Sequence, residues 1–374
     1  MALKTIVLIT NNINDGACGV GDYTIRLAEA LSNMDVNIHI LFTVPLNNRQ
    51  IFRNPNIQLH QQNIDSSLKN YIEKCFDKHT TAIVWQYTPN LYSKRGLPFQ
   101  ILNIFRQIKQ GGYHQDIFFH EASVRAFGHG IKQWLLAVMQ QFICRRLALM
   151  ATKSMTNIAF NKQYLNPAQV SVIPVGANIM APARMLKADG GFKVFCFSNK
   201  LNVEALKCFY TLSRDIKEFK VVIAGNCTLS QQSFIQNGIS KYQLNSVVDY
   251  RSVLEATDLA NTMSTCDILL QPGTVVRGEG GVSFKNGSLI AAMQMGLPII
   301  SNKGDMTDEG FTHLQNIVFA NGTTEHDYYK AIKLLYSDAV LKEAVGANAR
   351  AYYETHLSWP VIASRILNII NAGA

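Results

Sequence analysis

The segment from Gly280 to Ser288 has residue types suited to holding an anion. Glycines and small polar residues there precede an apolar, helix-like stretch. Asn286 is suited to cap that helix, and Gly296 to end it. Backbone N–H groups at a helix start carry partial positive charge, and Lys285 adds a full one. The pattern therefore predicts binding of a phosphate or diphosphate group.

A second glycine segment lies near the N-terminus, after an expected strand at Lys4 to Thr10. Gly19 and Gly21 could let a ligand approach the backbone, or could simply form a tight turn. A dinucleotide fingerprint is the other alternative, but Thr24 stands where its third glycine belongs. The next expected strand, 36–42, ends without the acidic residue that holds an NAD ribose. An oxidoreductase is therefore disfavoured.

These segments recur within an alternation of strand and helix patterns, which favours an α/β fold with parallel sheets covered on both faces. Helical patterns lie at 66–78, 98–110, 132–150 and 323–372. Strands are expected at 4–10, 36–42, 57–60, 82–86, 116–119, 192–197, 219–224, 246–250, 267–271 and 297–301. At 374 residues, the chain is long enough for two domains.

Positive charge is concentrated in the first half of the chain. Residues 1–175 hold 17 Lys/Arg against 9 Asp/Glu, whereas residues 176–374 hold 18 against 17. This balance suits nucleic acid, anionic lipid or a phosphate-bearing substrate, and it also suits a merely soluble surface. The apolar 132–150 helix, with Arg145 and Arg146 near its end, fits either a membrane-surface face or core packing. Core packing is the preferred interpretation.

Several classes of site are disfavoured by what the sequence lacks. It has no Asp-x-Asp pair for a divalent ion, no Walker A motif, no zinc spacing and no Gly-x-Ser-x-Gly elbow. The seven cysteines are scattered, without a C-x-x-C pair, and are expected to be reduced thiols of a cytoplasmic protein. The apolar run 6–9 is short for a signal peptide. We expect no metal and no other cofactor.

Three segments resemble retaining family 4 glycosyltransferases. Ala291 to Pro298, with the sequence AAMQMGLP, resembles their EAMAxGxP segment, and Cys18 to Tyr23 resembles GGVGxY after the first strand. Val170 to Asn178 resembles the VIPNGVD strand and hinge. Both glutamates of the family's Glu-x7-Glu motif are replaced here, by Ser283 and Ala291. This form resembles a divergent branch of the superfamily.

The resemblance implies the GT-B fold, with two Rossmann-like doubly wound domains facing a cleft. An acceptor-binding domain would comprise 1–175 and a nucleotide-sugar-binding domain 176–355, with a C-terminal helix, 356–374, crossing back to the first domain. The implied partners are a nucleotide-sugar donor and a glycan or lipid-linked acceptor, with anionic membrane as a further contact and no nucleic acid. The implied activity is a metal-independent, retaining glycosyltransferase in cell-surface polysaccharide synthesis.

The resemblance and the strand-end positions together give a set of candidate site residues. A histidine beside the donor sugar is implied at the strand end near 120, although a lone histidine there is more often structural. Each candidate cation, taken singly, is also more often a solvated surface group. The candidates are catalytic His120, Glu121 and Lys285; donor-binding Gly19, Val20, Gly21, Lys200, Arg251, Glu279, Ser283, Asn286, Gly287 and Ser288; and acceptor-binding Tyr87, Lys94 and Arg95.

Two other functions fit the same sequence. The loss of both motif glutamates would suit a catalytically silent GT-B scaffold or binding subunit of a polysaccharide assembly complex. A nucleotide-sugar epimerase of the same fold would need no separate acceptor. The glycine segments, His120 with Glu121, and Lys285 favour the transferase over the scaffold.

Overall fold

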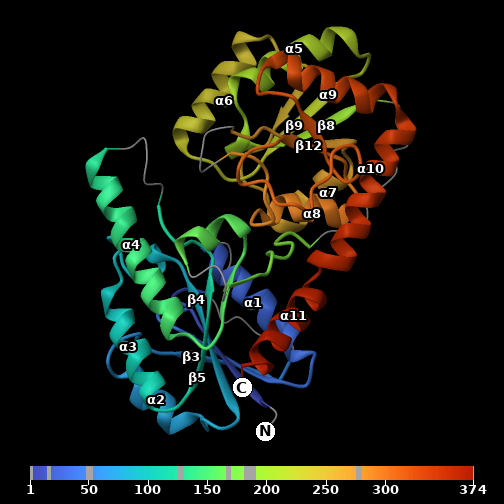
Figure 1. Ribbon diagram of the computed structural model, residues 1–374. Helices are drawn as coiled ribbons and strands as arrows, with labels where there is room; N and C mark the ends of the chain where they lie inside the picture. Colours follow the sequence, from blue (N-terminus) through green and yellow to red (C-terminus); the bar gives the residue numbers. More distant parts are fainter. Residues whose placement is uncertain are drawn as a thin grey trace. The chain divides into compact units, whose positions relative to one another are not determined.

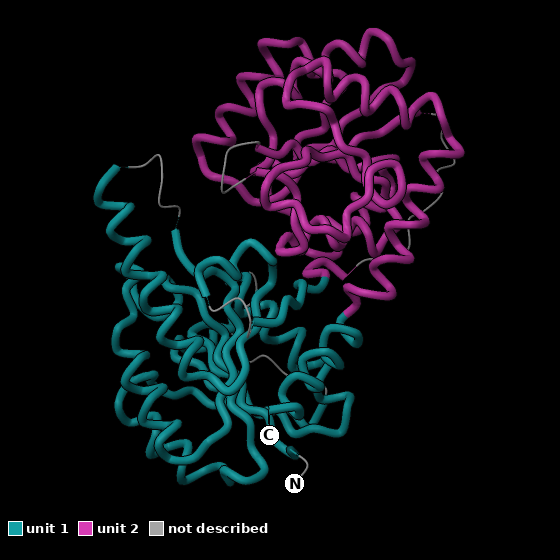
Figure 2. Tube along the Cα trace, viewed as in Figure 1, with its two compact units in different colours: residues 1–176, 359–374 teal, residues 177–358 magenta. Residues whose placement is uncertain are grey.

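The computed structural model describes residues 3–14, 18–47, 54–124, 130–165, 170–180, 191–274 and 280–373. The chain divides into two compact units (Figure 2). Unit 1 comprises Met1–Gly176 and Trp359–Ala374, and unit 2 comprises Ala177–Ser358. Each unit has its own sheet and its own core.

The strands described in unit 1 form one parallel sheet in the order β3-β2-β1-β4-β5-β6-β7 (Figure 1). Most of these strands are apolar and buried, as expected for a parallel sheet covered on both faces. The strands are β1 (Thr5–Ile9), β2 (Asn37–Phe42), β3 (Ile57–Gln61), β4 (Thr81–Tyr87), β5 (His114–Phe119), β6 (Ser154–Thr156) and β7 (Val170–Val172).

Helices connect and cover the strands of unit 1. The C-terminal helix α11 lies against α1, where the Trp359 and Tyr23 rings are 5.2 Å apart. The helices are α1 (Gly19–Ser32), α2 (Leu68–Cys75), α3 (Phe99–Gln110), α4 (Ile131–Met150) and α11 (Trp359–Asn371), with short 3-10 turns η1 (Pro89–Leu91) and η2 (Ala159–Tyr164).

Unit 2 repeats this architecture with its described strands in the order β10-β9-β8-β11-β12-β13, all parallel. The strands are β8 (Lys193–Phe197), β9 (Lys220–Ala224), β10 (Val248–Tyr250), β11 (Ile268–Gln271), β12 (Ile299–Asn302) and β13 (Val318–Ala320). The helices are α5 (Val203–Asp215), α6 (Leu229–Lys241), α7 (Ala256–Ser264), α8 (Gly287–Met295), α9 (Glu325–Ser337) and α10 (Ala339–Tyr352), with a 3-10 turn η4 (Ser198–Lys200) and a π turn η5 (Tyr353–Leu357).

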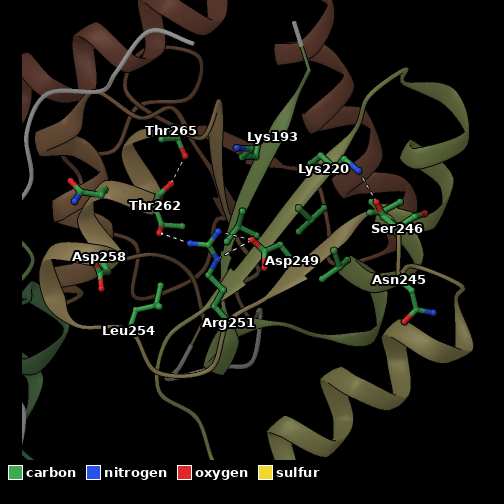
Figure 3. Close-up of a pocket in the computed structure, with 15 residues that line it drawn as sticks. Lys193, Lys220, Asn245, Ser246, Asp249, Arg251, Leu254, Asp258, Thr262 and Thr265 are labelled. Atoms are coloured by element: carbon green, nitrogen blue, oxygen red, sulfur yellow. Dashed lines mark hydrogen bonds and ion pairs between the residues drawn. The ribbon is translucent and has the colours of Figure 1, made fainter. Parts of the chain in front are cut away.

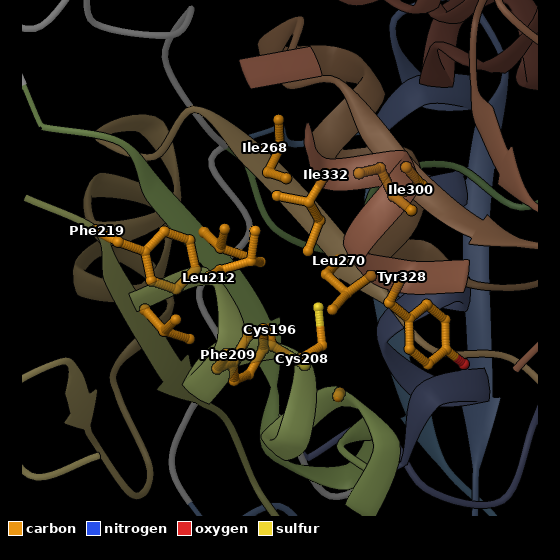
Figure 4. Packing of buried hydrophobic residues seen from close by; sticks show 14 of the residues in the cluster. Cys196, Cys208, Phe209, Leu212, Phe219, Ile268, Leu270, Ile300, Tyr328 and Ile332 are labelled. Atoms are coloured by element: carbon orange, nitrogen blue, oxygen red, sulfur yellow. The ribbon is translucent and has the colours of Figure 1, made fainter. Parts of the chain in front are cut away.

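The core of unit 2 lies between its sheet and the helices that pack on it (Figure 4). Phe209 and Leu212 of α5 and Ile332 of α9 meet Leu270 of β11 and other apolar strand residues there. Unit 1 has a comparable core, which includes Ile143, Cys144, Leu147 and Ala148 of α4. These cores fix the strand ends, and therefore the loops that follow them.

The strand order reverses at one point in each sheet. In unit 1 this point lies between β1 and β4, where Ile9 pairs with Trp85. In unit 2 it lies between β8 and β11, where Leu269 pairs with Phe195. Doubly wound proteins bind ligands beside such switch points, at the carboxyl ends of the strands. We therefore take the site residues from these two edges.

For helix α4, core packing was the preferred interpretation, and the structure corrects it for the outer face of the helix. Its inner face is buried, as expected, but six apolar residues of its outer face are exposed by 38 to 74%. The core can bury only one face of a helix that is apolar all round. Within the residues that the structure describes, no helix is both long and apolar enough to cross a membrane.

Candidate functional site

Two lysines lie near each other beside the switch point of unit 2. Lys200 ends the η4 turn that follows β8, and Lys285 immediately precedes the cap of α8. Partial burial lowers the pKa of Lys200 from its ordinary value, and the neighbouring charge of Lys285 lowers it further. Both side chains retain solvent contact. Among the described residues, no carboxylate forms an ion pair with either lysine.

The start of α8 is capped as the sequence predicts. The cap, however, uses backbone N–H groups that we expected to be free to bind an anion. The Asn286 side-chain oxygen accepts hydrogen bonds from the backbone N–H groups of Ser288 (3.1 Å) and Leu289 (3.2 Å). Gly287 leaves no room for a side chain, because an added Cβ would lie 2.7 Å from Asn178 Oδ1. Ser288 is thus not an open anion donor, and the charge of the two lysines matters more than the helix start.

The loop that carries Lys285 is held firmly by its neighbours. Gly281 has a φ of +91° and donates its N–H to the Thr274 carbonyl at 2.8 Å. The Phe284 N–H donates to Asp308 Oδ2 at 2.6 Å, and the Phe284 ring stacks on Phe311 with centroids 4.1 Å apart. Lys285 therefore projects from a fixed backbone, so the loop loses little conformational entropy when an anion binds.

Two buried polar atoms at the same switch point lack a partner. The Ser198 hydroxyl at the end of β8 and the Gln271 side-chain oxygen at the end of β11 have no hydrogen bond within the described part of the chain. Ser198 is fully buried, and Gln271 is 6% exposed. Leaving such a group unsatisfied costs about 1–3 kcal/mol. A ligand or an ordered water at this edge would remove that cost.

The positions of the missing glutamates are occupied by small buried residues. Ser283 is 5% exposed, and Ala291 is fully buried within α8. Neither can grip ribose hydroxyls as a carboxylate would. Asn302, at the end of β12, instead organises this edge: its side-chain oxygen accepts from the Gly273 N–H at 2.8 Å and from the Tyr328 hydroxyl at 3.1 Å.

His120 lies at the switch-point edge of unit 1 and is held by Gln86. Its Nε2 donates to Gln86 Oε1 at 2.8 Å, which leaves Nδ1 as an acceptor. Burial lowers the pKa of His120 to about 3, so the ring is neutral near pH 7. Glu121 is exposed, and the hydrogen bond to the ring comes from Gln86. Gln86, and not Glu121, therefore holds the His120 ring in place.

Three more polar atoms around His120 have no hydrogen-bond partner in the described residues. They are the Thr10 hydroxyl, the Tyr23 hydroxyl and the Gln86 side-chain nitrogen. The Tyr23 ring packs edge-on against His120 with centroids 4.7 Å apart. Each of these side chains is at most 5% exposed. Unsatisfied donors therefore gather at the switch point of unit 1, as unsatisfied groups do in unit 2.

The first glycine segment forms the start of α1. Gly19, Val20 and Gly21 are its first three residues, and the preceding residue provides no side-chain cap. A Cβ on Gly21 would lie 2.2 Å from the Asn12 carbonyl, so a tight approach of backbone requires this glycine. By contrast, nothing lies within 4 Å of a Cβ placed on Gly19. The start of α1 therefore lacks the side-chain cap that α8 has, although Asp22 adds a negative charge to its first turn.

The three acceptor candidates are not equivalent. Tyr87 is fully buried between Tyr92 and Phe119, so the structure removes it from any acceptor surface. Lys94 and Arg95 are exposed on the loop before α3. They remain candidates for an anionic acceptor.

Arg251, a candidate donor-binding cation, instead lines a separate pocket beside β10. Its guanidinium pairs with Asp249 at 2.7 Å and donates to the Thr262 hydroxyl at 3.2 Å (Figure 3). It lines a pocket of about 720 Å³ with Lys193, Lys220 and α7, beside the edge strand β10. Its charge is already engaged, and we remove it from the donor site. The donor-binding candidate Glu279 lies outside the described residues.

Sequence reasoning missed Ser198, Gln271, Gln86, Thr10 and Asn302. Each is a polar residue at or directly after the end of a buried apolar strand. That position is the signal that could have identified them, because ligands of doubly wound folds bind where such strands end.

Solved structures identify the architecture. Sucrose-phosphate synthase from Thermosynechococcus elongatus superposes with a TM-score of 0.72 at 14% identity, over 98% of each chain. Anabaena HepE in complex with UDP also gives 0.72, at 12% identity, over 99% of this chain and all of that one. The fold is GT-B. The predicted fold class is therefore confirmed. A mutant of S. aureus TarM in complex with Fondaparinux, alpha-GlcNAc-glycerol and UDP gives 0.69 at 10% identity, over 99% and 100% of the two chains.

Sequence matches are confined to parts of the GT-B chain. Residues 189–352 match the family model described as Glycosyl transferases group 1. A Corynebacterium glutamicum GDP-mannose-dependent monoacylated alpha-(1-6)-phosphatidylinositol monomannoside mannosyltransferase is 28% identical over 125 residues. That alignment spans 33% of this chain and 32% of the relative. Both matches support a glycosyltransferase.

Proposed function

We propose that this GT-B protein transfers a sugar from a nucleoside-diphosphate-sugar donor to a glycan or lipid-linked acceptor, with retention of anomeric configuration, in cell-surface polysaccharide synthesis. The observation that carries the proposal is the Lys200–Lys285 pair. Neither lysine has a carboxylate partner in the described chain, and the pKa of Lys200 is lowered first by partial burial and then by the neighbouring charge of Lys285. An anion with two or more charges would relieve the repulsion between the two lysines.

The diphosphate is both the part of the donor to be bound and the leaving group of the reaction. Its charge grows as the bond to the sugar breaks, so fixed cations stabilise the transition state more than the ground state. Lys285, on its held loop, would act on the departing diphosphate, and Lys200 would reinforce it. These cations supply charge that other designs take from a divalent metal, so no metal is required in the proposed reaction.

Two of the similar proteins favour this class of donor. The relative from Corynebacterium is named as GDP-mannose-dependent, and HepE was solved with UDP and with UDP-glucose. The edge around Ser198 and Gln271 offers unsatisfied buried polar groups that a nucleotide or its sugar would satisfy.

Unit 1 would contribute acceptor and sugar contacts. The free Nδ1 of His120 can accept from a sugar hydroxyl, while the Tyr23 hydroxyl and Gln86 nitrogen can donate to one. Lys94 and Arg95 are placed for a phosphate of an anionic acceptor. A pocket whose buried polar groups each require a hydrogen-bond partner discriminates well among sugars, because a wrong epimer leaves some of these groups unpaired.

Thermal unfolding against UDP, GDP, CDP and ADP and their sugars tests the proposal. A ligand at about a hundred times its dissociation constant adds roughly 2.7 kcal/mol of stability, enough for a clear rise in midpoint. We expect a rise with one diphosphate, lost in Lys200→Gln/Lys285→Gln. Lys217→Gln/Lys330→Gln, which removes two exposed lysines of the same unit, is the matched control and should keep the rise. No rise with any nucleotide would contradict the donor site.

The scaffold remains the second candidate because Ser283 and Ala291 supply no carboxylate. Release of nucleoside diphosphate from the bound donor, followed with and without glycan acceptors, separates the two. Turnover supports the transferase. Donor binding without turnover on any acceptor would support a binding subunit.

A further inference from the structure

The outer face of α4 is apolar, although it belongs to the surface of unit 1. It consists of Ile131, Trp134, Leu135, Val138, Met139 and Phe142, and we call these residues the α4 face. Their exposed fractions are 74, 43, 49, 43, 38 and 52%. The spacing of i, i+3, i+4, i+7, i+8 and i+11 places them along one side of the helix. The opposite side packs on the core through Ile143, Cys144 and Leu147.

An apolar stripe of this length is unusual for a surface that meets only water. Isolated exposed apolar residues are common, but contiguous ones mark a contact with a partner or a membrane. With a rise of about 1.5 Å per residue, the stripe from Ile131 to Phe142 runs for roughly 17 Å. These side chains protrude from a convex helix, so they form a ridge and not a groove. A protruding apolar ridge is suited to insertion into a deformable surface.

The charged side chains of α4 itself, and of α3 beside it, are all positive. Lys132, Arg145 and Arg146 are exposed on α4 itself, and the Arg146 guanidinium lies 5.8 Å from the centre of the Phe142 ring. Residues 130–165 contain five Lys/Arg and no Asp/Glu, and residues 78–115 also contain five and none. Helix α3, which lies beside α4 (Figure 1), adds Arg106 and Lys109.

This distribution decides between possible occupants. An acidic groove on a protein partner would need cations at a few matched positions. Here the positive charge extends over α3, α4 and the Lys94–Arg95 loop, which Gln140 ties to α4 through a 3.0 Å bond to the Gly96 carbonyl. A broad positive field around an apolar helix with Trp and Phe matches the surface of an anionic bilayer.

We propose that the α4 face docks on anionic lipid bilayers, with the apolar residues in the headgroup boundary and the cations against lipid phosphates. The helix lies on the membrane and does not cross it. This inference goes beyond the proposed function, since it requires neither donor binding nor turnover.

Vesicle flotation of the full chain tests the docking directly. The purified protein is mixed with phosphatidylcholine vesicles, with and without phosphatidylglycerol. We expect flotation with the anionic vesicles, weakened about fivefold for each cation removed near the surface, as in Arg145→Gln/Arg146→Gln. Leu135→Glu/Phe142→Glu should abolish it. Equal flotation with neutral and anionic vesicles would overturn the anionic preference.

A matched control separates docking from added charge. Leu229→Glu/Val340→Glu places the same two charges on residues of unit 2 that are 80 and 82% exposed. It should float like the unaltered protein. If both double variants lose flotation equally, the α4 face is not the docking surface. Thermal midpoints near that of the unaltered protein verify that the variants fold.

Trp134 reports insertion independently of these variants. The other tryptophans, Trp85 and Trp359, are buried, so a blue shift of fluorescence on adding anionic vesicles would come from Trp134. Trp134→Phe should lose the shift while still floating. No shift in the unaltered protein would overturn insertion of this face. If the chain instead dimerises in solution and Leu135→Glu/Phe142→Glu makes it monomeric, a second copy covers the face and the proposal fails.

Discussion

In the proposed function, Lys200 and Lys285 act as a pair that selects a polyanion. Both lysines retain solvent contact, and Lys200 is also partly desolvated. Together they form a local excess of positive charge, which the partial desolvation of Lys200 strengthens by reducing solvent screening. A singly charged ligand neutralises half of it, whereas a diphosphate neutralises all of it.

Replacement of Lys285 should affect the reaction far more than the fold. Lys285→Ala removes a fixed cation beside the leaving group, so we expect turnover to fall on the order of a hundredfold. The side chain is exposed and unpaired in the described structure, so the unfolding free energy should change by less than about 0.5 kcal/mol. Steady-state kinetics and thermal unfolding measure both. Normal turnover would exclude Lys285 from the mechanism.

At alkaline pH, binding of the donor should be accompanied by proton uptake at Lys200. The pKa of Lys200 is lowered in the free protein, and a bound diphosphate favours its charged form and raises that pKa again. Affinity should therefore be constant at low pH and fall as pH rises from the free to the bound pKa. Calorimetry in buffers of different ionisation enthalpy measures the uptake. Lys200→Arg keeps the charge and should lose the uptake; an unchanged uptake would assign it to another group.

At the scale of elements, α8 shows that a helix start can be stable without being an open anion site. Asn286 caps it, and Gly296 ends it in the left-handed conformation with a φ of +71°. The cap satisfies the N–H groups that a ligand would otherwise use. Helix stability and ligand binding therefore compete for the same donors.

Asn286→Ala should separate these two roles. Loss of the cap costs about 1 kcal/mol of stability, measurable as a lower unfolding midpoint. It also frees the N–H groups of Ser288 and Leu289, so affinity for a diphosphate should be maintained or increased. Asn286→Asp, which keeps the cap and adds a negative charge near the lysines, is the contrasting variant and should weaken binding. A drop in affinity for both variants would mean that Asn286 itself contacts the donor.

At the scale of the whole molecule, histidines that are buried or half-buried couple stability to pH. His39 Nδ1 and His60 Nε2 are 2.8 Å apart, and His60 Nδ1 is 2.8 Å from the Tyr71 hydroxyl. Burial, and then the charge of His60, lower the pKa of His39 from 6.5 to about 4. Burial also lowers the pKa of His60 and that of His120.

Acid should therefore destabilise the protein well before its carboxylates titrate. Between about pH 6.5 and 4 the unfolded chain binds protons that folded His39 does not, so this contribution to stability is complete above 6.5 and is lost on acidification. His39→Gln should flatten the dependence of the unfolding midpoint on pH across that window. His79→Gln, at an exposed position, is the control. An unchanged slope in His39→Gln would show that other groups dominate.

Local patterns along the chain were sufficient to predict the fold class and much of its detail. Apolar runs predicted most strands because parallel strands buried on both faces need continuous apolar sequence. Asn286 and Gly296 predicted the ends of α8, since capping depends on neighbouring backbone alone. The three-residue strands β6 and β13 were missed, because their pairing comes from distant partners and not from their own sequence.

Only the tertiary structure decided which side chains meet and which face remains outside. Gln86 holds His120, and Lys200 approaches Lys285, although the members of each pair lie far apart along the chain. Such pairings depend on strand order and loop paths that no local period encodes. Helix α4 gives the same lesson for packing: its apolar residues surround the axis, and only the position of the core determines that the α4 face stays exposed.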